Sequence, residues 1–429
     1  MTRTAYPLAR TTLENGLRVV VSEDHAVPAV AVNLWVGVGS RHESPGRTGF
    51  AHLFEHLMFQ GSRNVASGEH FSLLMDQGAR LNATTWFDRT NYFETVPTGA
   101  LELALWLEAD RHGHLLDAVS QENLDNQRDV VKEEKRQRYD NQPYGTALPD
   151  VYATVFPPDH PYHHATIGST EDLDAATLED VHAFFRAHYG PNNTVLTLAG
   201  DLTPEHGFAV AERYFRDLPP IELNRRPLLA QLPPLETPAR LDRMGGVPND
   251  RLYVTFRLPV DTTAQYHACA IAVDVLGGLA SSRLVHRLVR RDETATAVGG
   301  WTMGLVDGAG LGALTVDVAA GADAEAVEQA LVEEVARFVE EGPDDAEMES
   351  VVADTERAWL SSLSGLDERA DHISQYALLH DDPDYVNQLV AHVRAVTPDD
   401  VRSAAVQWLR PDSRAVVRFL AESDAEAAA

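Results

Sequence analysis

Apolar residues that alternate with smaller or polar ones predict β-strands in both halves of the chain. The clearest is 29–38, where Val30, Val32 and Leu34 alternate with smaller or polar neighbours, as in a half-buried sheet. The stretch 80–97 is rich in Thr and aromatic residues and favours a β-hairpin. The other predicted strands are 17–23, 194–200, 251–258, 297–306, 311–319 and 414–420.

Helical periodicity lies between these strands. Helices are predicted at about 48–60, 68–77, 99–115, 121–139, 177–188, 203–215, 264–276 and 281–290, with further helices before the last strand. The order helix, turn, strand over 177–201 recurs over 397–422, each time with Thr first and Asp-Val three residues later. This recurrence predicts two copies of one unit.

The proline-rich segment 216–240 has no hydrophobic period, and prolines remove backbone donors and break helices. It is therefore predicted to be a linker. It separates an N-terminal domain, 1–215, from a homologous C-terminal domain, 241–429.

The charge of the chain limits its partners. Its 429 residues include 35 basic and 65 acidic side chains, a net charge of −30. Such a charge argues against binding nucleic acid or an anionic membrane surface and favours basic peptides. A single cysteine, Cys269, excludes an internal disulfide, and we see neither a signal peptide in the first residues nor an apolar run that could span a membrane. We therefore expect a cytoplasmic location.

The segment 47–62 carries the candidate chemistry. His52 and His56 are four residues apart, so a helix places both imidazoles on one face, with Glu55 beside them. The order H-x-x-E-H is typical of inverzincins. Two histidines can supply two of the three protein ligands that a catalytic zinc needs, and a nearby carboxylate can accept a proton from water.

The third ligand should come from another element. Residues 124–141 form a charged predicted helix around an apolar Val130–Val131 pair, expected to be buried. Its Glu133 and Glu134 are both candidates, although a glutamate in such a charged run is usually a solvated surface residue. Gln127 and Glu134 are seven residues apart and share a helical face.

GFAHLFEHLMFQGS followed by QRDVVKEE resembles the M16 family of zinc metalloendopeptidases, which includes pitrilysin, insulysin and the mitochondrial processing peptidase. RLNATTWFDRTNY and HPYHHATIGS resemble further family motifs. The resemblance implies an α+β fold of two homologous α/β-layered domains, with largely antiparallel sheets packed against helices, and one Zn²⁺ per chain in the N-terminal domain. It also implies that His52, His56 and Glu134 are the ligands, that Glu55 is the base, and that the edge at Asn82 and Ala83 holds the substrate backbone.

Two positions depart from the family pattern. Gln127 stands where the family usually has an acidic residue; it can still hydrogen-bond near the metal but carries no charge. Arg290 matches the arginine of the family's C-terminal substrate-binding pattern, but Ala297 stands where that pattern has tyrosine. The likeness is therefore to the catalytic subunit of short bacterial members. It implies a heterodimer with an M16 subunit that carries the Arg/Tyr pair, or else a homodimer.

These inferences predict a zinc endopeptidase that cleaves unfolded or short peptides inside a chamber formed by two such chains. The alternative is an assembly or binding subunit that keeps the fold and has little turnover. The intact H-x-x-E-H motif with a distal glutamate favours the enzyme, because a scaffold has no physical need of all four groups.

Overall fold

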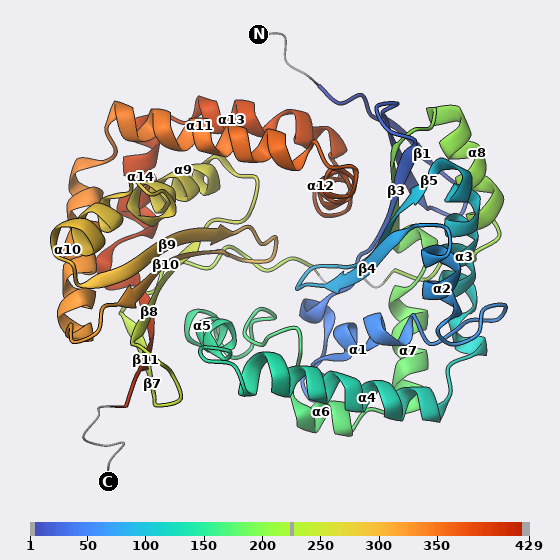
Figure 1. The fold of residues 1–429 in the computed structure, drawn as a ribbon, viewed down its shortest axis with the longest axis horizontal. Helices are drawn as coiled ribbons and strands as arrows, with labels where there is room; N and C mark the ends of the chain where they lie inside the picture. Colours follow the sequence, from blue (N-terminus) through green and yellow to red (C-terminus); the bar gives the residue numbers. More distant parts are fainter. Residues whose placement is uncertain (1–4, 224–226, 423–429) are drawn as a thin grey trace. The chain divides into compact units, whose positions relative to one another are not determined.

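Two sheets with matching strand orders organise the chain (Figure 1). The computed structural model describes residues 5–223 and 227–422. The first sheet has the order β1 (Ala9–Thr12), β2 (Arg18–Glu23), β6 (Thr194–Gly200), β3 (Ala29–Val36), β5 (Thr90–Pro97), β4 (Arg80–Thr85). The second has the order β7 (Ala239–Met244), β11 (Ala415–Leu420), β8 (Arg251–Leu258), β10 (Gly310–Val318), β9 (Ala295–Met303).

The second sheet repeats the first from β2 onward. Each contains one parallel pair, β2 with β6 and β7 with β11, and every other pair is antiparallel. The recurring helix is also present in both halves: Thr177 and Thr397 cap their helices in the same way, each with an Asp three residues later that closes a capping box. The predicted duplication and the α+β class, with largely antiparallel sheets and helices, are confirmed.

Contacts divide the described residues into two units that exchange segments. The first unit comprises 5–135, 165–223 and 359–389, and the second comprises 136–164, 227–358 and 390–422. The expected limits, 1–215 and 241–429, differ from these units because each half contributes one helical segment to the unit of the other half. Residues 224–226 of the predicted linker, and the two chain ends, lie outside the described residues.

Helices pack on both sheets. The first unit contains α1 (Phe50–Leu57), α2 (Glu69–Met75), α3 (Leu101–His114), α4 (Gln121–Lys135), α6 (Thr170–Asp174), α7 (Leu178–His188), α8 (Pro204–Phe215) and α12 (Leu366–Leu379). The second contains α5 (Ala147–Val155), α9 (Ala264–Val273), α10 (Ala324–Glu341), α13 (Leu389–Ala395) and α14 (Pro398–Trp408), and α11 (Asp345–Ser362) leads from the second unit into the first. The helix predicted at 281–290 is present as a π-helix, Val285–Arg291. Among the described residues, no helix combines the length and apolar character needed to cross a bilayer.

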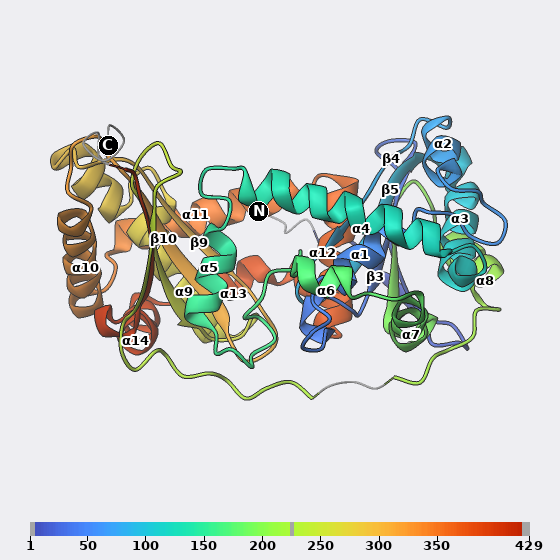
Figure 2. The same ribbon diagram turned by 90° about the horizontal axis from the view of Figure 1, so that it is seen from below.

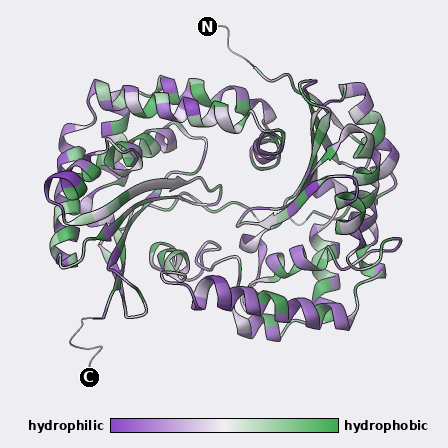
Figure 3. Cartoon of the chain, viewed as in Figure 1, coloured by the Kyte–Doolittle hydropathy of each residue, from purple (hydrophilic) through white to green (hydrophobic). Residues whose placement is uncertain are grey.

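The central strand β3 of the first sheet is buried on both faces. Val30, Val32 and Leu34 lie in a core with α3 and α8, whereas Ala31 contacts Ala370 of α12 on the opposite face (Figures 1 and 2). The strand predicted from the alternation at 29–38 is present as β3, but the expectation that it is half-buried is wrong, because the small residue Ala31 makes room for α12. Figure 3 shows that the helices carry both hydrophobic and hydrophilic stretches, as expected for layers packed on one side.

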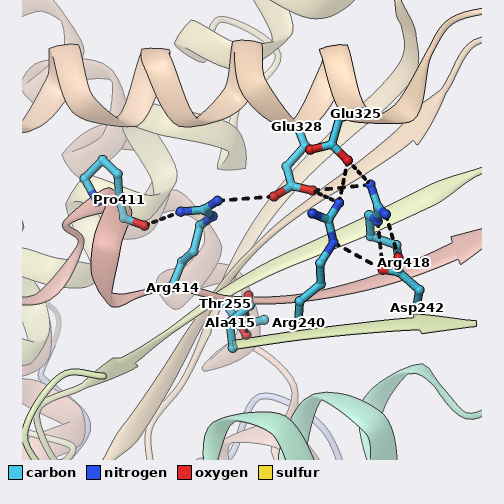
Figure 4. A network of polar contacts seen from close by, with 9 residues as sticks. All are labelled: Arg240, Asp242, Thr255, Glu325, Glu328, Pro411, Arg414, Ala415 and Arg418. Carbon is cyan, nitrogen blue, oxygen red and sulfur yellow. Dashed lines mark hydrogen bonds and ion pairs between the residues drawn. The ribbon is translucent and has the colours of Figure 1, made fainter. Parts of the chain in front are cut away.

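An ion-pair network stabilises the edge of the second sheet (Figure 4). Arg418 of β11 binds Asp242 of β7 at 2.6 Å and Glu325 of α10 at 2.7 Å. Arg240 binds both Glu325, at 2.8 Å, and Glu328, at 2.9 Å. The network joins the parallel pair β7 and β11 to α10, and it involves residues of the second unit only.

Arg369 anchors α12 to the first unit. Its guanidinium, 1% exposed, pairs with Asp24 at 2.7 Å and lies over the ring of Tyr6. Removing one partner of a buried pair leaves an uncompensated charge, so Arg369→Ala should lower the free energy of unfolding by about 3 kcal/mol. Arg357→Ala, which removes an ion pair made by a side chain that is 70% exposed, should change it by less than about 1 kcal/mol. Denaturant unfolding of both variants measures the difference, and equal effects would contradict the anchoring role.

Candidate metal centre

Helix α1 has one face for packing and another for chemistry. Its apolar residues Phe50, Leu53, Phe54 and Leu57 are all buried, and Phe54 packs against Phe184 of α7. The helix starts after Gly49, whose φ of 86° favours glycine and whose Cβ would meet the carbonyl oxygen of Ile167 at 2.7 Å. This packing fixes the face that carries His52, Glu55 and His56, whose side chains stay partly exposed.

The carboxylate of Glu43 caps the start of this helix. Its two oxygens accept hydrogen bonds from the backbone N–H groups of Gly49, at 3.0 Å, and Ala51, at 2.8 Å. These donors would otherwise have no partner within the helix, and a negative charge at a helix N-terminus is favourable. Glu43 therefore stabilises the first turn, in which His52 lies.

Glu134 joins the two histidines at the last turn of α4. Its Oε2 lies 3.6 Å from Nε2 of His52 and 3.3 Å from Nε2 of His56. One ligand atom from each of these three residues lies within 4.8 Å of the other two, and this is the group of potential metal ligands found among the described residues. Glu133 is not part of it.

The helical phase of α4 explains why Glu134 is the residue brought to this point. Leu124, Gln127 and Val131 are buried, and Glu134 continues their spacing of three and four residues. Val130 is 42% exposed, so the expectation of a buried Val130–Val131 pair is wrong for Val130. Arg128 holds the helix to α6, donating to the carbonyl oxygens of Leu173 at 2.8 Å and of Ala176 at 2.7 Å.

The three residues fit a zinc ion. Two imidazole nitrogens and one carboxylate oxygen are a common protein donor set for catalytic zinc. Ligand bonds of about 2.0–2.1 Å in a tetrahedron place neighbouring ligand atoms about 3.4 Å apart. The measured separations of 3.6 and 3.3 Å are close to that spacing.

Glu55 is held beside the cluster without being part of it. Its Oε2 accepts a hydrogen bond of 2.6 Å from Oγ1 of Thr85, on β4. Burial raises the pKa of Glu55 above its ordinary value, and the hydrogen bond from Thr85 and the nearby His56 oppose that rise. Thr85 was not among the residues selected from the sequence, although it lies in the stretch RLNATTWFDRTNY that resembles a family motif.

Strand β4 lies at the edge of the first sheet, since β5 is its neighbour on one side and no strand follows on the other among the described residues. The N–H of Ala83 donates to Oδ1 of its neighbour Asn82 at 2.9 Å. The Asn82 side chain is exposed. An extended peptide could pair with such an edge.

The remaining predicted site residues are found on α4 and in the second unit. Gln127 is 7% exposed on α4, two turns before Glu134. Arg290 belongs to the second unit, where its guanidinium donates to the carbonyl oxygen of Ala280 at 2.7 Å. Ala297 lies on β9 in the same unit. Substrate contact by Arg290 stays a prediction.

Comparison with known proteins identifies the family. Residues 18–162 match the profile described as Insulinase (Peptidase family M16), and residues 175–354 match the profile described as Peptidase M16 inactive domain. The zinc protease PqqE of Helicobacter pylori is 31% identical over 303 residues, which cover 69% of this chain and 67% of that protein. An uncharacterised zinc protease of Streptomyces coelicolor is 26% identical over 403 residues, covering 92% and 86%.

Solved structures share the fold. The crystal structure of a protease from Helicobacter pylori superposes with a TM-score of 0.89 at 24% identity, covering 97% of this chain and 100% of that one. A peptidase M16 inactive domain from Pseudomonas fluorescens superposes with a TM-score of 0.86 at 16% identity, covering 97% and 98%. Together, the matched profiles, the relatives and the shared fold show that this chain belongs to the M16 peptidase family.

Proposed function

We propose that this chain is a zinc-dependent endopeptidase of unfolded or short peptides. The observation that carries the proposal is the convergence of His52, His56 and Glu134 beside Glu55 on the H-x-x-E-H helix. Relatives named zinc proteases support it. We propose one Zn²⁺ per chain, held by these two histidines and Glu134, with Gln127 as a nearby hydrogen-bonding group.

In this proposal the residues have separate roles in hydrolysis. Zinc, when bound, would polarise the scissile carbonyl and lower the pKa of water toward about 7. Glu55 takes the proton of the attacking water and later delivers it to the leaving amine. The free edge of β4, around Asn82 and Ala83, holds the peptide backbone by strand addition, which requires little of its sequence.

The hydrogen bond from Thr85 keeps the Glu55 carboxylate in one orientation. Thr85→Val preserves the shape of the side chain and removes the O–H, so we expect kcat to fall about tenfold while zinc content and KM stay unchanged. Thr85→Ser should restore most of the rate. Steady-state kinetics with metal analysis measures this, and a valine variant with normal kcat would refute the positioning role.

We further propose that the chain acts in a dimer that encloses the substrate. Ala297 replaces the tyrosine of the family's C-terminal pattern, which favours a heterodimer with an M16 subunit that carries the Arg/Tyr pair over a homodimer. In such a chamber Arg290 would contact the substrate. A cytoplasmic location is the accompanying expectation.

A second candidate is an assembly or binding subunit with little turnover. The match of residues 175–354 to a profile described as an inactive domain favours it, as does the lack of charge at Gln127. The two candidates differ in a direct assay of the purified full chain, of known zinc content, with a mixture of basic unstructured peptides. Cleavage that chelation abolishes and zinc restores supports the peptidase. Failure to cleave, by a zinc-loaded chain in its native oligomeric state, supports the second candidate.

A further inference from the structure

A polar cavity lies between the first turns of α12 and one face of the first sheet. Its volume is about 520 Å³, and it belongs entirely to the first unit. The sheet contributes Asn33, Asn91 and Thr84, and the helix side contributes Asp367, Glu368 and Asp371. The His52, His56 and Glu134 cluster does not line it.

Asp371 is fixed in this cavity by three side chains. Its Oδ1 accepts hydrogen bonds from Trp35 Nε1 at 2.8 Å, Asn91 Nδ2 at 2.9 Å and Asn33 Nδ2 at 3.2 Å. Asn33, Asn91 and Trp35 are at most 3% exposed, so the sheet holds the carboxylate rigidly. All three donors bind the same oxygen, and no donor to Oδ2 occurs among the described residues.

The cavity has excess negative charge. Asp367, Glu368 and Asp371 make no ion pair within the described part of the chain. The cationic side chain among the described residues that line the cavity, Arg89, donates to the carbonyl and hydroxyl oxygens of Thr84 and stacks on Trp35. Its charge also interacts with that of Asp371, but it is one positive charge against three carboxylates. Burial lowers the pKa of His372, which also lines the cavity, so this ring does not supply a compensating charge near neutral pH.

The cavity opens beside the strand edge next to Glu55. Thr84 lines the cavity and pairs with Asn91 in the sheet, and the next residue of β4, Thr85, binds Glu55 from the other face. Side chains of an extended peptide added to β4 would alternate between the two faces, about 3.3 Å apart along the strand. A substrate residue within about two positions of the scissile peptide bond, which would lie beside Glu55, would therefore face the cavity.

We propose that this cavity is a specificity subsite for a basic side chain, lysine or arginine, of the bound peptide. Asp371 Oδ2 is the principal acceptor, and Asp367 and Glu368 supply further negative charge. The inference rests on the proposed function for the placement of the peptide along β4. It assigns to α12, a segment from the C-terminal half of the sequence, a part in substrate selection by the N-terminal half.

Matched peptides test the subsite. A set with one variable residue, placed in turn at the two positions on either side of the bond that is cut, carries Arg, Lys, Gln or norleucine. We expect kcat/KM to be at least about tenfold higher for the basic residue at one of these positions. Asp371→Asn keeps an oxygen for the three donors and removes the charge, so it should reduce that preference to about twofold or less and leave the norleucine peptide unchanged.

Controls separate this inference from the proposed function. Asp76→Asn removes a charge from an exposed residue of the same unit and should leave the preference intact. The same peptides, carrying a fluorescent label, can be bound to the Glu55→Gln variant, which gives a readout without turnover. The peptide with the basic residue should bind this variant more tightly than the neutral peptides do. A preference in binding without any cleavage by the wild type would refute the peptidase and support the subsite. Cleavage with equal kcat/KM for basic and neutral peptides, or a preference that survives Asp371→Asn combined with Glu368→Gln, would overturn the subsite.

Discussion

Glu55→Gln is expected to abolish peptide cleavage while the chain still binds one zinc ion. Glutamine has nearly the same shape and can keep a hydrogen bond to Thr85, but it cannot accept a proton from water. Loss of a general base costs about 10²- to 10⁴-fold in rate, so kcat should fall by a factor within or above that range. The measurement is steady-state cleavage of an unstructured peptide beside metal analysis of the same preparation.

The zinc content of this variant is its essential control. His52, His56 and Glu134 are unchanged, so metal should be retained and the fold preserved. A variant that loses both zinc and activity would reveal nothing about the base. Cleavage at the normal rate by zinc-loaded Glu55→Gln would assign the base to another group.

Glu134→Ala is expected to lose zinc and, with it, activity. The substitution removes the carboxylate whose Oε2 lies 3.6 Å and 3.3 Å from the Nε2 atoms of His52 and His56. Two imidazoles alone are fewer protein ligands than a catalytic zinc site uses, so the affinity should fall by more than about a hundredfold. Competition with a chromogenic zinc chelator gives the dissociation constant.

Glu133→Ala is the matched control for this experiment. It removes the same group from the neighbouring position of the same helix, but Glu133 lies outside the cluster. Its zinc affinity should stay within about threefold of the wild type. Full retention of zinc by Glu134→Ala, or its loss in Glu133→Ala, would place the third ligand elsewhere.

Much of the local structure could be predicted because it depends on short-range pattern. The hairpin at 80–97 follows from its β-branched and aromatic residues, and β4 and β5 form there. The capped helices at 177–188 and after Thr397 follow from their Thr and Asp residues. The placement of His52 and His56 on one helical face likewise followed from their spacing of four residues and the geometry of a helix.

Long-range packing could not be predicted in the same way. Nothing local distinguishes a segment that packs on its own half from one that packs on the other, so the exchange of 136–164 and 359–389 became visible only in three dimensions. The double burial of β3 depends on Ala31 meeting Ala370, which lies in the other half of the sequence. Short edge strands such as β1 carry little hydrophobic signal and were missed for that reason.

The candidate site also divides into a part that local sequence predicts and a part that depends on long-range packing. Its two histidines and Glu55 could be selected from one segment, whereas the choice between Glu133 and Glu134 depended on the phase of α4 and on resemblance to the family. The buried stripe of Leu124, Gln127 and Val131, continued by Glu134, is a physical signal that supports Glu134 independently of that resemblance. Thr85 was missed because its contact is with Glu55 on α1, and Asp371 because its contacts are with side chains of the first sheet, so both depend on packing between distant segments.

The most direct test is a crystal structure of zinc-loaded Glu55→Gln with an uncleaved peptide, recorded at the zinc absorption edge. We expect one anomalous peak within coordinating distance of His52, His56 and Glu134, and the peptide paired with the free edge of β4. Zinc bound elsewhere, or a peptide that lies away from this edge, would contradict the proposed centre.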